Sequence, residues 1–169
     1  MIEQSPPPVI NTSPLIFLTK ADLLYLLEAR YSTVLLPSTV ANEIQQYGTS
    51  DLTYQVIQSN DWLVTVETPS IPTPIRACNL DPGESTVLAW AYVHPGTEAI
   101  LDDLAGRRCA NALQIPVRGT LGLVLAAKKE GEISAAKPLL LKLQEVGMYL
   151  SDRVISQALT MVEESLEDS

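Results

Sequence analysis

Short apolar runs alternate with longer stretches of helical periodicity along the chain. The apolar runs predict strands at Pro8–Ile10, Val34–Leu36, Leu63–Val66, Ala99–Leu101 and Ile115–Val117. Helical patterns occupy residues near 21–30, 50–58, 83–93, 104–113, 119–130, 135–146 and 152–164, and two further helices follow Ser13-Pro14 and Pro37-Ser38. Strands that alternate with helices in this way are typical of a parallel sheet covered by helices. The pattern therefore predicts an α/β fold in one domain without internal repeats.

The composition is that of a folded chain outside the membrane. Of the 169 residues, 46% are hydrophobic and 18% are charged, which is too apolar for a disordered protein. The longest apolar run, residues 121–127, is far shorter than the roughly 20 residues of a membrane span. The first ten residues lack the basic and apolar regions of a secretory signal peptide. We therefore expect a cytoplasmic protein without a membrane partner.

The two cysteines, Cys78 and Cys109, do not form a recognisable disulfide or metal-binding motif. They stand 31 positions apart, and neither has a second Cys or a His at the spacing of metal ligands. The sequence thus signals neither a zinc site nor a disulfide. We expect buried free thiols in a reducing compartment.

Polar residues follow the first and fourth predicted strands. Asn11, Thr12 and Ser13 come directly after the first strand, and Asp102-Asp103 comes after the fourth. Ligands of parallel sheets bind beyond the carboxyl ends of the strands, so these positions are candidates for a site. Because neighbouring carboxylates repel each other, such a pair is solvated and caps a helix or is held by a cation.

Two helical carboxylates add to this candidate site. At 100° per residue, Glu84 lies in the middle of the apolar face of its helix, where an unpaired charge is costly. That face is formed by Val87, Leu88 and Ala91. Glu43 lies at the edge of the apolar stripe of another helix. Carboxylates from a strand end and two helices can meet at one place, and hard oxygens are the ligands that Mg²⁺ or Mn²⁺ selects.

Each of these residues also has a structural interpretation. The segment Asp81–Glu84 fits a capping box, with Asp81 as the N-cap and Pro82 at the first helical position. Asp103 can cap the helix that starts at Leu104, and Glu43 can be an ordinary residue at the edge of an amphipathic helix. His94, the single histidine, precedes Pro95-Gly96 and is expected to cap the end of a helix.

Several short motifs occur in the order of a known family. They are Val9–Ile16, Leu36–Val40 with Glu43, Leu80–Glu84, Ile100–Asp103 with Arg107-Arg108, Arg118–Gly122 with Ala126–Lys128 and Gly131, and Pro138–Leu140 with Leu150-Ser151. In this order, over residues 8–162, they resemble the PIN-domain nuclease superfamily. The similarity is to an uncharacterised bacterial branch related to the toxin nucleases of toxin–antitoxin pairs.

The resemblance implies a fold and an activity. The expected fold is a three-layer α/β/α sandwich with a parallel five-stranded sheet, in one PIN-like domain over 1–169 with a core of about 8–162 and an acidic tail at 163–169. The implied activity is hydrolysis of phosphodiester bonds in single-stranded RNA by a metal-dependent endoribonuclease that uses Mg²⁺ or Mn²⁺. The implied partners are RNA, an antitoxin protein if the chain is a toxin, and a second copy in a homodimer.

The resemblance also assigns roles to individual residues. It implies catalytic positions at Asn11, Glu43, Glu84 and Asp103, metal ligands at Glu43, Glu84, Asp102 and Asp103, and a supporting hydroxyl at Ser13. Asn11 departs from the family pattern, because most of the superfamily has Asp there. An amide oxygen can still contact a metal or a water but carries no charge. We therefore expect weaker metal affinity and reduced catalysis.

The charged residues are distributed unevenly along the chain. The net charge of −9 argues against binding nucleic acid by bulk charge. Residues 1–103 carry 3 basic and 12 acidic side chains, whereas residues 104–162 carry 8 basic and 4 acidic ones. We expect the basic part to hold an RNA backbone beside the acidic site. The RNA-binding candidates are Arg107, Arg108, Arg118 and Lys128.

Two other functions compatible with the sequence belong to different classes. One is a catalytically silent PIN-like module that binds RNA or a protein. The other is a metal-dependent phosphatase built on Asp102-Asp103, which is disfavoured because the sequence has no Asp-x-Asp nucleophile motif there.

Overall fold

The sheet of the protein is built from five short parallel strands in the computed structural model, which describes residues 5–167. The strands are β1 (Val9–Ile10), β2 (Val34–Pro37), β3 (Leu63–Val66), β4 (Ala99–Ile100) and β5 (Val117–Arg118). Their order is β3-β2-β1-β4-β5, and each neighbouring pair is parallel. The chain therefore adds β2 and β3 on one side of β1, and then β4 and β5 on the other. This reversal between β1 and β4 creates the crevice in which open α/β sheets bind ligands.

Burial explains why the strands are apolar runs. In the central strands β1 and β4, Val9, Ile10, Ala99 and Ile100 have no exposed surface. Strands covered by helices on both faces lose the alternation of apolar and polar residues. The edge strand β3 keeps part of that alternation, because Leu63 is buried whereas Val64 is 39% exposed.

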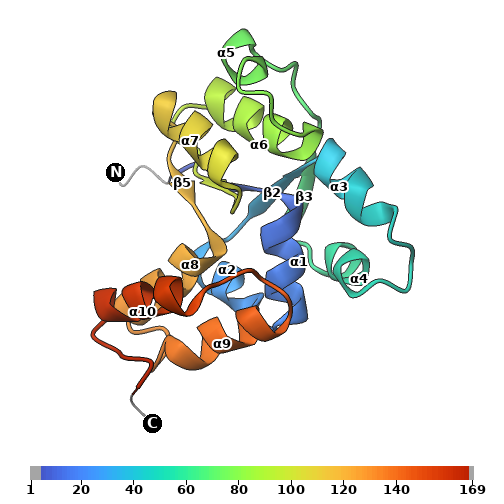
Figure 1. Cartoon of the computed structure of the whole chain (residues 1–169). Helices are drawn as coiled ribbons and strands as arrows, with labels where there is room; N and C mark the ends of the chain where they lie inside the picture. Colours follow the sequence, from blue (N-terminus) through green and yellow to red (C-terminus); the bar gives the residue numbers. More distant parts are fainter. Residues whose placement is uncertain (1–4, 168–169) are drawn as a thin grey trace, which may run out of the picture.

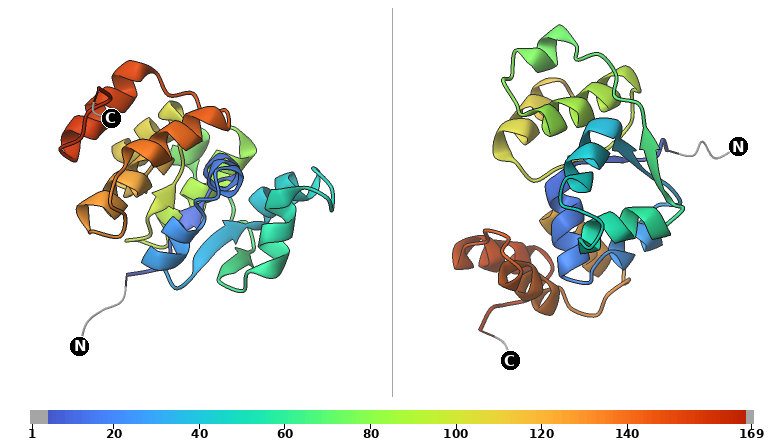
Figure 2. Two further views of the ribbon diagram at one scale, coloured as in Figure 1. Left: turned by 90° about the horizontal axis from the view of Figure 1, so that it is seen from below. Right: turned by 90° about the vertical axis from the view of Figure 1, so that its right-hand side faces the viewer.

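Helices cover both faces of the sheet (Figure 1). They are α1 (Thr12–Lys20), α2 (Tyr25–Arg30), α3 (Ser38–Gln45), α4 (Leu52–Ser59), α5 (Thr73–Arg76), α6 (Pro82–Val93), α7 (Leu104–Ala112), α8 (Thr120–Lys129), α9 (Lys137–Glu145) and α10 (Asp152–Met161). Figure 1 shows α5, α6 and α7 above the sheet and α1, α2, α8, α9 and α10 below it, and the right-hand view of Figure 2 shows the same layers. On the upper face, α6 packs against β1, β2 and β4. The predicted α/β/α sandwich is confirmed.

Side-chain caps define where several helices begin. Asp51, Asp81, Asp103 and Ser151 each accept a hydrogen bond from the backbone N–H three residues later. The first helix starts earlier than expected, because Asn11 is its N-cap and Thr12, Ser13 and Pro14 lie inside its first turn. The short helix α5 was not predicted, because it lies in a proline-rich segment that reads as a loop.

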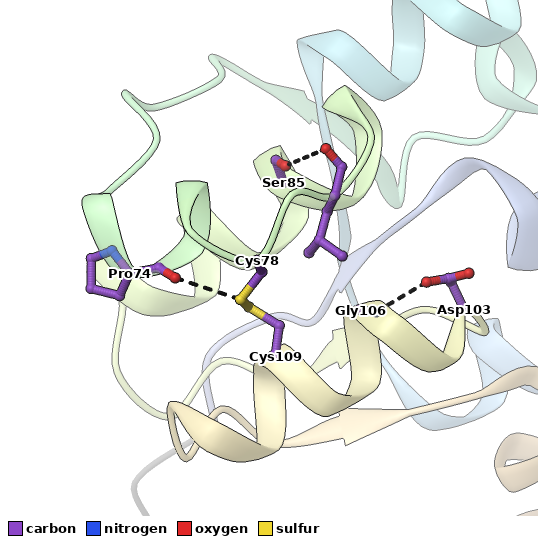
Figure 3. The surroundings of a disulfide bond; sticks show 7 residues. Pro74, Cys78, Ser85, Asp103, Gly106 and Cys109 are labelled. Carbon is purple, nitrogen blue, oxygen red and sulfur yellow. Dashed lines mark hydrogen bonds between the residues drawn. A yellow bond between two sulfur atoms is a disulfide. The ribbon is translucent and has the colours of Figure 1, made fainter.

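The expectation of free thiols is wrong, because Cys78 and Cys109 form a disulfide. Cys78 follows α5 and Cys109 lies on α7, and the fold brings the two segments together (Figure 3). A separation of 31 residues gives no such signal in the sequence. Cysteine usage therefore does not support a reducing compartment.

The C-terminal segment is attached to the fold at Glu164, a residue of the predicted acidic tail. Its carboxylate accepts hydrogen bonds from the backbone N–H groups of Ala136 and Lys137, at 2.8 and 3.1 Å. These groups lie at the start of α9, where a negative charge is favourable. Within residues 5–167, no helix has the length and apolar character needed to cross a membrane.

Candidate functional site

The candidate site lies at the carboxyl ends of β1 and β4, on either side of the crevice. Asn11 follows β1 directly, and Asp102-Asp103 follows β4. The helices α3 and α6 pack against each other, and they carry Glu43 and Glu84. Four elements that are distant in sequence thus supply polar side chains to one edge of the sheet.

One half of the site is formed by Asn11 and Glu43 around Gly83. Asn11 is 6% exposed, and its Oδ1 atom has no hydrogen-bond partner in the described part of the chain. The hydroxyl of Thr12 donates to Glu43 Oε2 at 2.6 Å. A Cβ atom at Gly83 would stand 3.0 Å from Asn11 Oδ1 and 2.7 Å from Glu43 Oε1. The absence of a side chain at Gly83 therefore lets the backbone of α6 approach both oxygens.

The other half is formed by Glu84 and Asp103 around Gly106. Glu84 is 8% exposed, in agreement with its predicted place on the apolar face of its helix. A Cβ atom at Gly106 would stand only 2.7 Å from Leu101 Cδ1, and it would lie at ordinary contact distances of 3.7 Å from Glu84 Oε2 and 3.9 Å from Asp103 Oδ2. Asp103 Oδ2 also accepts a hydrogen bond from the Gly106 N–H at 3.0 Å (Figure 3). Asp103 is thus both the N-cap of α7 and a neighbour of Glu84.

Charges from both halves of the site act on Glu84. Burial raises the pKa of Glu84 to about 7, and the charges of Asp81, Asp103 and Glu43 contribute in the same direction. A hydrogen bond with Asp81 adds to this increase. Carboxylates that disfavour each other's charge in this way are stabilised by a bound cation.

Asp102 has a different environment from Asp103. Its Oδ1 accepts a hydrogen bond from the Thr120 N–H at 2.7 Å, and its Oδ2 accepts one from the Thr120 hydroxyl at 2.8 Å. Burial raises the pKa of Asp102, although the Thr120 hydrogen bonds and Arg107 act in the opposite direction. Both oxygens therefore tie β4 to the start of α8, and within residues 5–167 the Asp102 side chain makes its hydrogen bonds to Thr120 rather than to the other candidate ligands.

The side-chain oxygens of the site are of the type that binds hard divalent cations. Carboxylates and an amide carbonyl are the ligands of Mg²⁺ and Mn²⁺, and the unpartnered Oδ1 of Asn11 is a donor atom without a role in the fold. Among residues 5–167, no group of three His, Cys, Asp or Glu side chains stands close enough together to hold a metal ion. The donors instead form the two pairs beside Gly83 and Gly106.

The predicted RNA-binding cations divide into two pairs. Arg107 and Arg108 are exposed on α7, the helix that begins at Asp103. Arg118 pairs with Glu98 at 3.3 Å. Lys128 donates to the Ser134 carbonyl at 2.6 Å and lies 3.6 Å from Glu164. Arg118 and Lys128 are thus engaged in contacts within the fold.

Sequence reasoning gave no role to two glycines that shape the site, Gly83 and Gly106, and it did not assign the contact with Glu43 to Thr12. The predicted supporting hydroxyl was that of Ser13, which is exposed, whereas the neighbouring Thr12 contacts Glu43. Glycine is a poor helix former, so its presence in the first turns of α6 and α7 was a usable signal of close approach.

The structure confirms that Asp81 and His94 cap the two ends of α6. His94 is the C-cap of α6, and its Nδ1 lies 2.9 Å from the Trp90 carbonyl. Asp81 accepts a hydrogen bond from the Glu84 N–H at 2.9 Å. These caps position α6 without removing Glu84 from the acidic site.

Comparison with known proteins agrees with the fold. A family model described as a PIN domain matches residues 7–164, which is more than half of the chain. No curated protein matches the chain. The match spans all five strands and all four positions that surround Gly83 and Gly106. The chain therefore belongs to the PIN-domain family, whose fold is of the nuclease type.

Proposed function

We propose that the protein is a metal-dependent endoribonuclease that hydrolyses phosphodiester bonds of single-stranded RNA. The observation that carries the proposal is the convergence of two oxygen pairs, Asn11 with Glu43 and Glu84 with Asp103, at the crevice between β1 and β4. Family membership supports a nuclease-type activity, and the mutual destabilisation of the carboxylates supports a cation between them.

The side chains of the site have separable tasks in this proposal. Glu43, Glu84 and Asp103, with the Asn11 oxygen, would hold Mg²⁺ or Mn²⁺, which would polarise the phosphate and activate a water. Thr12 fixes the Glu43 carboxylate, and the Gly106 N–H fixes that of Asp103. In the absence of metal the pKa of Glu84 is raised to about 7, and a bound cation would favour its ionised, ligating form.

A direct test compares cleavage of single-stranded RNA in Mn²⁺ by the protein and by Glu84→Gln and Asp103→Asn. Both substitutions keep the shape of the side chain, and Asn caps a helix about as well as Asp. We expect each to reduce cleavage by roughly a hundredfold or more, because a ligand charge is lost. Glu145→Gln, an exposed residue at the end of α9, is the matched control and should leave cleavage unchanged. Equal activity of all four proteins would overturn the proposal.

A catalytically silent PIN-like module is the second candidate. The observation in its favour is that Asn11 is uncharged and that no three acidic side chains of the described residues are close enough to form a metal site. Calorimetric titration with Mn²⁺ separates the two candidates. Binding that Glu84→Gln weakens supports the nuclease, and no binding at millimolar Mn²⁺ supports the silent module.

The toxin role and the homodimer are extensions of the proposal that depend on the resemblance alone. A toxin would act on cellular RNA in the cytoplasm and would be encoded next to a small antitoxin gene. Co-expression with the product of such a neighbouring gene should yield a stable complex with suppressed RNA cleavage. Light scattering of the purified protein should give twice the mass of the 169-residue chain if it forms the dimer.

A further inference from the structure

A cavity of about 480 Å³ opens beside the amino-terminal end of α6, the helix that carries Glu84. Its walls come from the loop after β3, the turn between α5 and α6, and the first turn of α6. Pro82 and Ser85 line it from the same helical turn that carries Glu84. One turn of helix rises about 5 Å, so the cavity lies within about one turn of Glu84 along α6, on a side of the helix that faces away from the Glu84 carboxylate. We call it the α6 cavity.

The charge of the α6 cavity differs from that of its surroundings. The described residues that line it include no carboxylate, although Asp81 and Glu84 flank it in sequence. Arg76, one of the 3 basic side chains in residues 1–103, lies in its wall. Its Nη2 donates to the Ile71 carbonyl at 3.2 Å, which orients the guanidinium and leaves other N–H donors for a ligand. The cavity therefore favours an anion in an otherwise acidic part of the chain.

The remaining walls combine apolar surface with unpaired polar groups. Ile71, Leu80 and Pro82 supply apolar surface. The Asn79 side chain makes no hydrogen bond to the described residues, so both its amide donors and its acceptor are available. Such a cavity suits a flat group with polar edges that is joined to an anion. An unstacked RNA base with its phosphate has this chemistry.

We propose that the α6 cavity binds one base of a single-stranded RNA whose backbone crosses the candidate site, and that Arg76 pairs with a phosphate next to that base. The class of ligand rests on the proposed function, because the neighbouring acidic edge is where that backbone would be cleaved. The volume lies within the roughly 300 to 1,000 Å³ of sites that bind small molecules. The cavity thus gives the nuclease a preference for one nucleotide position beside the scissile bond.

Binding of mononucleotides tests the proposal without requiring cleavage. The four ribonucleoside 5′-monophosphates are titrated one at a time into the protein in calorimetry, with inorganic phosphate as the comparison. We expect at least one nucleotide to bind more tightly than phosphate. Arg76→Gln should weaken that binding roughly tenfold, because one charged contact is lost. The exposed Lys129→Gln on α8 is the matched control and should have no effect.

A second variant fills the cavity. Ser70 is an exposed loop residue of its wall, so Ser70→Trp places a large side chain there without disturbing the core. It should abolish nucleotide binding and raise the KM for RNA with little change in kcat. Ser50→Trp, in another exposed loop, is its control and should change neither quantity. Thermal melting checks that both variants are folded.

The outcomes separate this inference from the proposed function. Nucleotide binding that Ser70→Trp abolishes, in a protein that does not cleave RNA, would refute the nuclease and keep the cavity assignment. RNA cleavage with the same KM in Ser70→Trp and the unchanged protein would keep the nuclease and overturn the cavity assignment. Nucleotides that bind no better than phosphate up to millimolar concentration would overturn it as well.

Discussion

At the scale of single residues, Gly83 sets how closely α6 approaches Asn11 and Glu43. A Cβ atom there would stand 2.7 Å from Glu43 Oε1, and Thr12 restrains that carboxylate through a hydrogen bond. We predict that Gly83→Ala displaces Glu43 and lowers Mn²⁺ affinity roughly tenfold. Stability should change little, because Ala is about 1 kcal/mol better than Gly inside a helix and offsets part of the crowding.

Calorimetry with Mn²⁺ and thermal melting check the two parts of this prediction. Gly122→Ala on α8 is the control, since the side chain nearest to it is that of Arg118 and not a carboxylate. Unchanged Mn²⁺ affinity in Gly83→Ala would show that the close approach at this glycine does not shape the site.

The raised pKa of Glu84 predicts how the stability of the metal-free protein depends on pH. Its pKa in the folded protein is about 7, above the ordinary value of 4.5, chiefly because the side chain is buried. The folded state therefore binds the proton more tightly than the unfolded state. The resulting stabilisation is complete below the ordinary pKa and is lost as the pH rises through about 7. In EDTA, Tm should fall between about pH 5 and about pH 8, and Glu84→Gln should reduce this decrease. The same pH dependence in both proteins would contradict the prediction.

The polar residues Asn11, Glu84 and Asp103 were predictable from the sequence, whereas the contacts made by Thr12 and Gly83 were not. Glu84 was found because a carboxylate on an apolar helical face is costly, and Asp103 because it follows a strand. Thr12 has no unusual chemistry of its own, and a glycine in a helix signals a close approach without naming the residue approached. Thr12 and Gly83 both contact Glu43, which is distant along the chain, and one sequence does not display such contacts.

At the scale of secondary structure elements, the Cys78–Cys109 disulfide connects the segment before α6 to α7. Glu84 lies on α6, and Asp103 is the N-cap of α7. Closing a loop of 31 residues stabilises a fold by on the order of 3 to 4 kcal/mol in the chain-entropy model. We predict that Cys78→Ser lowers Tm by roughly 10 °C relative to the oxidised protein. A reductant should lower the Tm of the unchanged protein similarly and should leave Cys78→Ser unaffected. Equal Tm values with and without reductant would contradict the prediction.

The element boundaries show which physical signals a sequence contains. The order of strands and helices was predicted because buried parallel strands are short apolar runs and the helices have apolar faces. The single turn of α5 was missed because Pro72 and Pro74 argue locally for a loop, although Pro74 stands in the first turn, where proline is tolerated. The disulfide was missed for a related reason, since it depends on how α5 and α7 are placed by the whole fold.

At the scale of the whole molecule, the division of charge along the sequence is partly cancelled by the fold. Arg118 pairs with Glu98 from the acidic part, and Lys128 lies 3.6 Å from Glu164 of the C-terminal segment. Two of the four predicted RNA-binding cations are therefore partly neutralised. Arg107 and Arg108 are exposed on α7, whose first residue follows Asp103, although the charge of Arg107 also acts on Asp102. Their position makes α7 the best candidate for a phosphate contact beside the acidic crevice.

This difference between the cations predicts how RNA affinity depends on salt. Cations that neutralise phosphates release counterions, and each contact contributes about 0.7 to the slope of log affinity against log salt for single strands. The combined variant Arg107→Ala with Arg108→Ala should weaken binding of single-stranded RNA and reduce this slope by roughly 1.4, if both side chains contact phosphate. Lys142→Ala, an exposed cation on α9, is the control and should leave the slope unchanged. The slope is measured by fluorescence anisotropy of labelled RNA between about 50 and about 200 mM salt. Every protein in this comparison also carries Glu84→Gln, so that the RNA is not cleaved. A slope that survives the double substitution would place the phosphate contacts on another surface of the molecule.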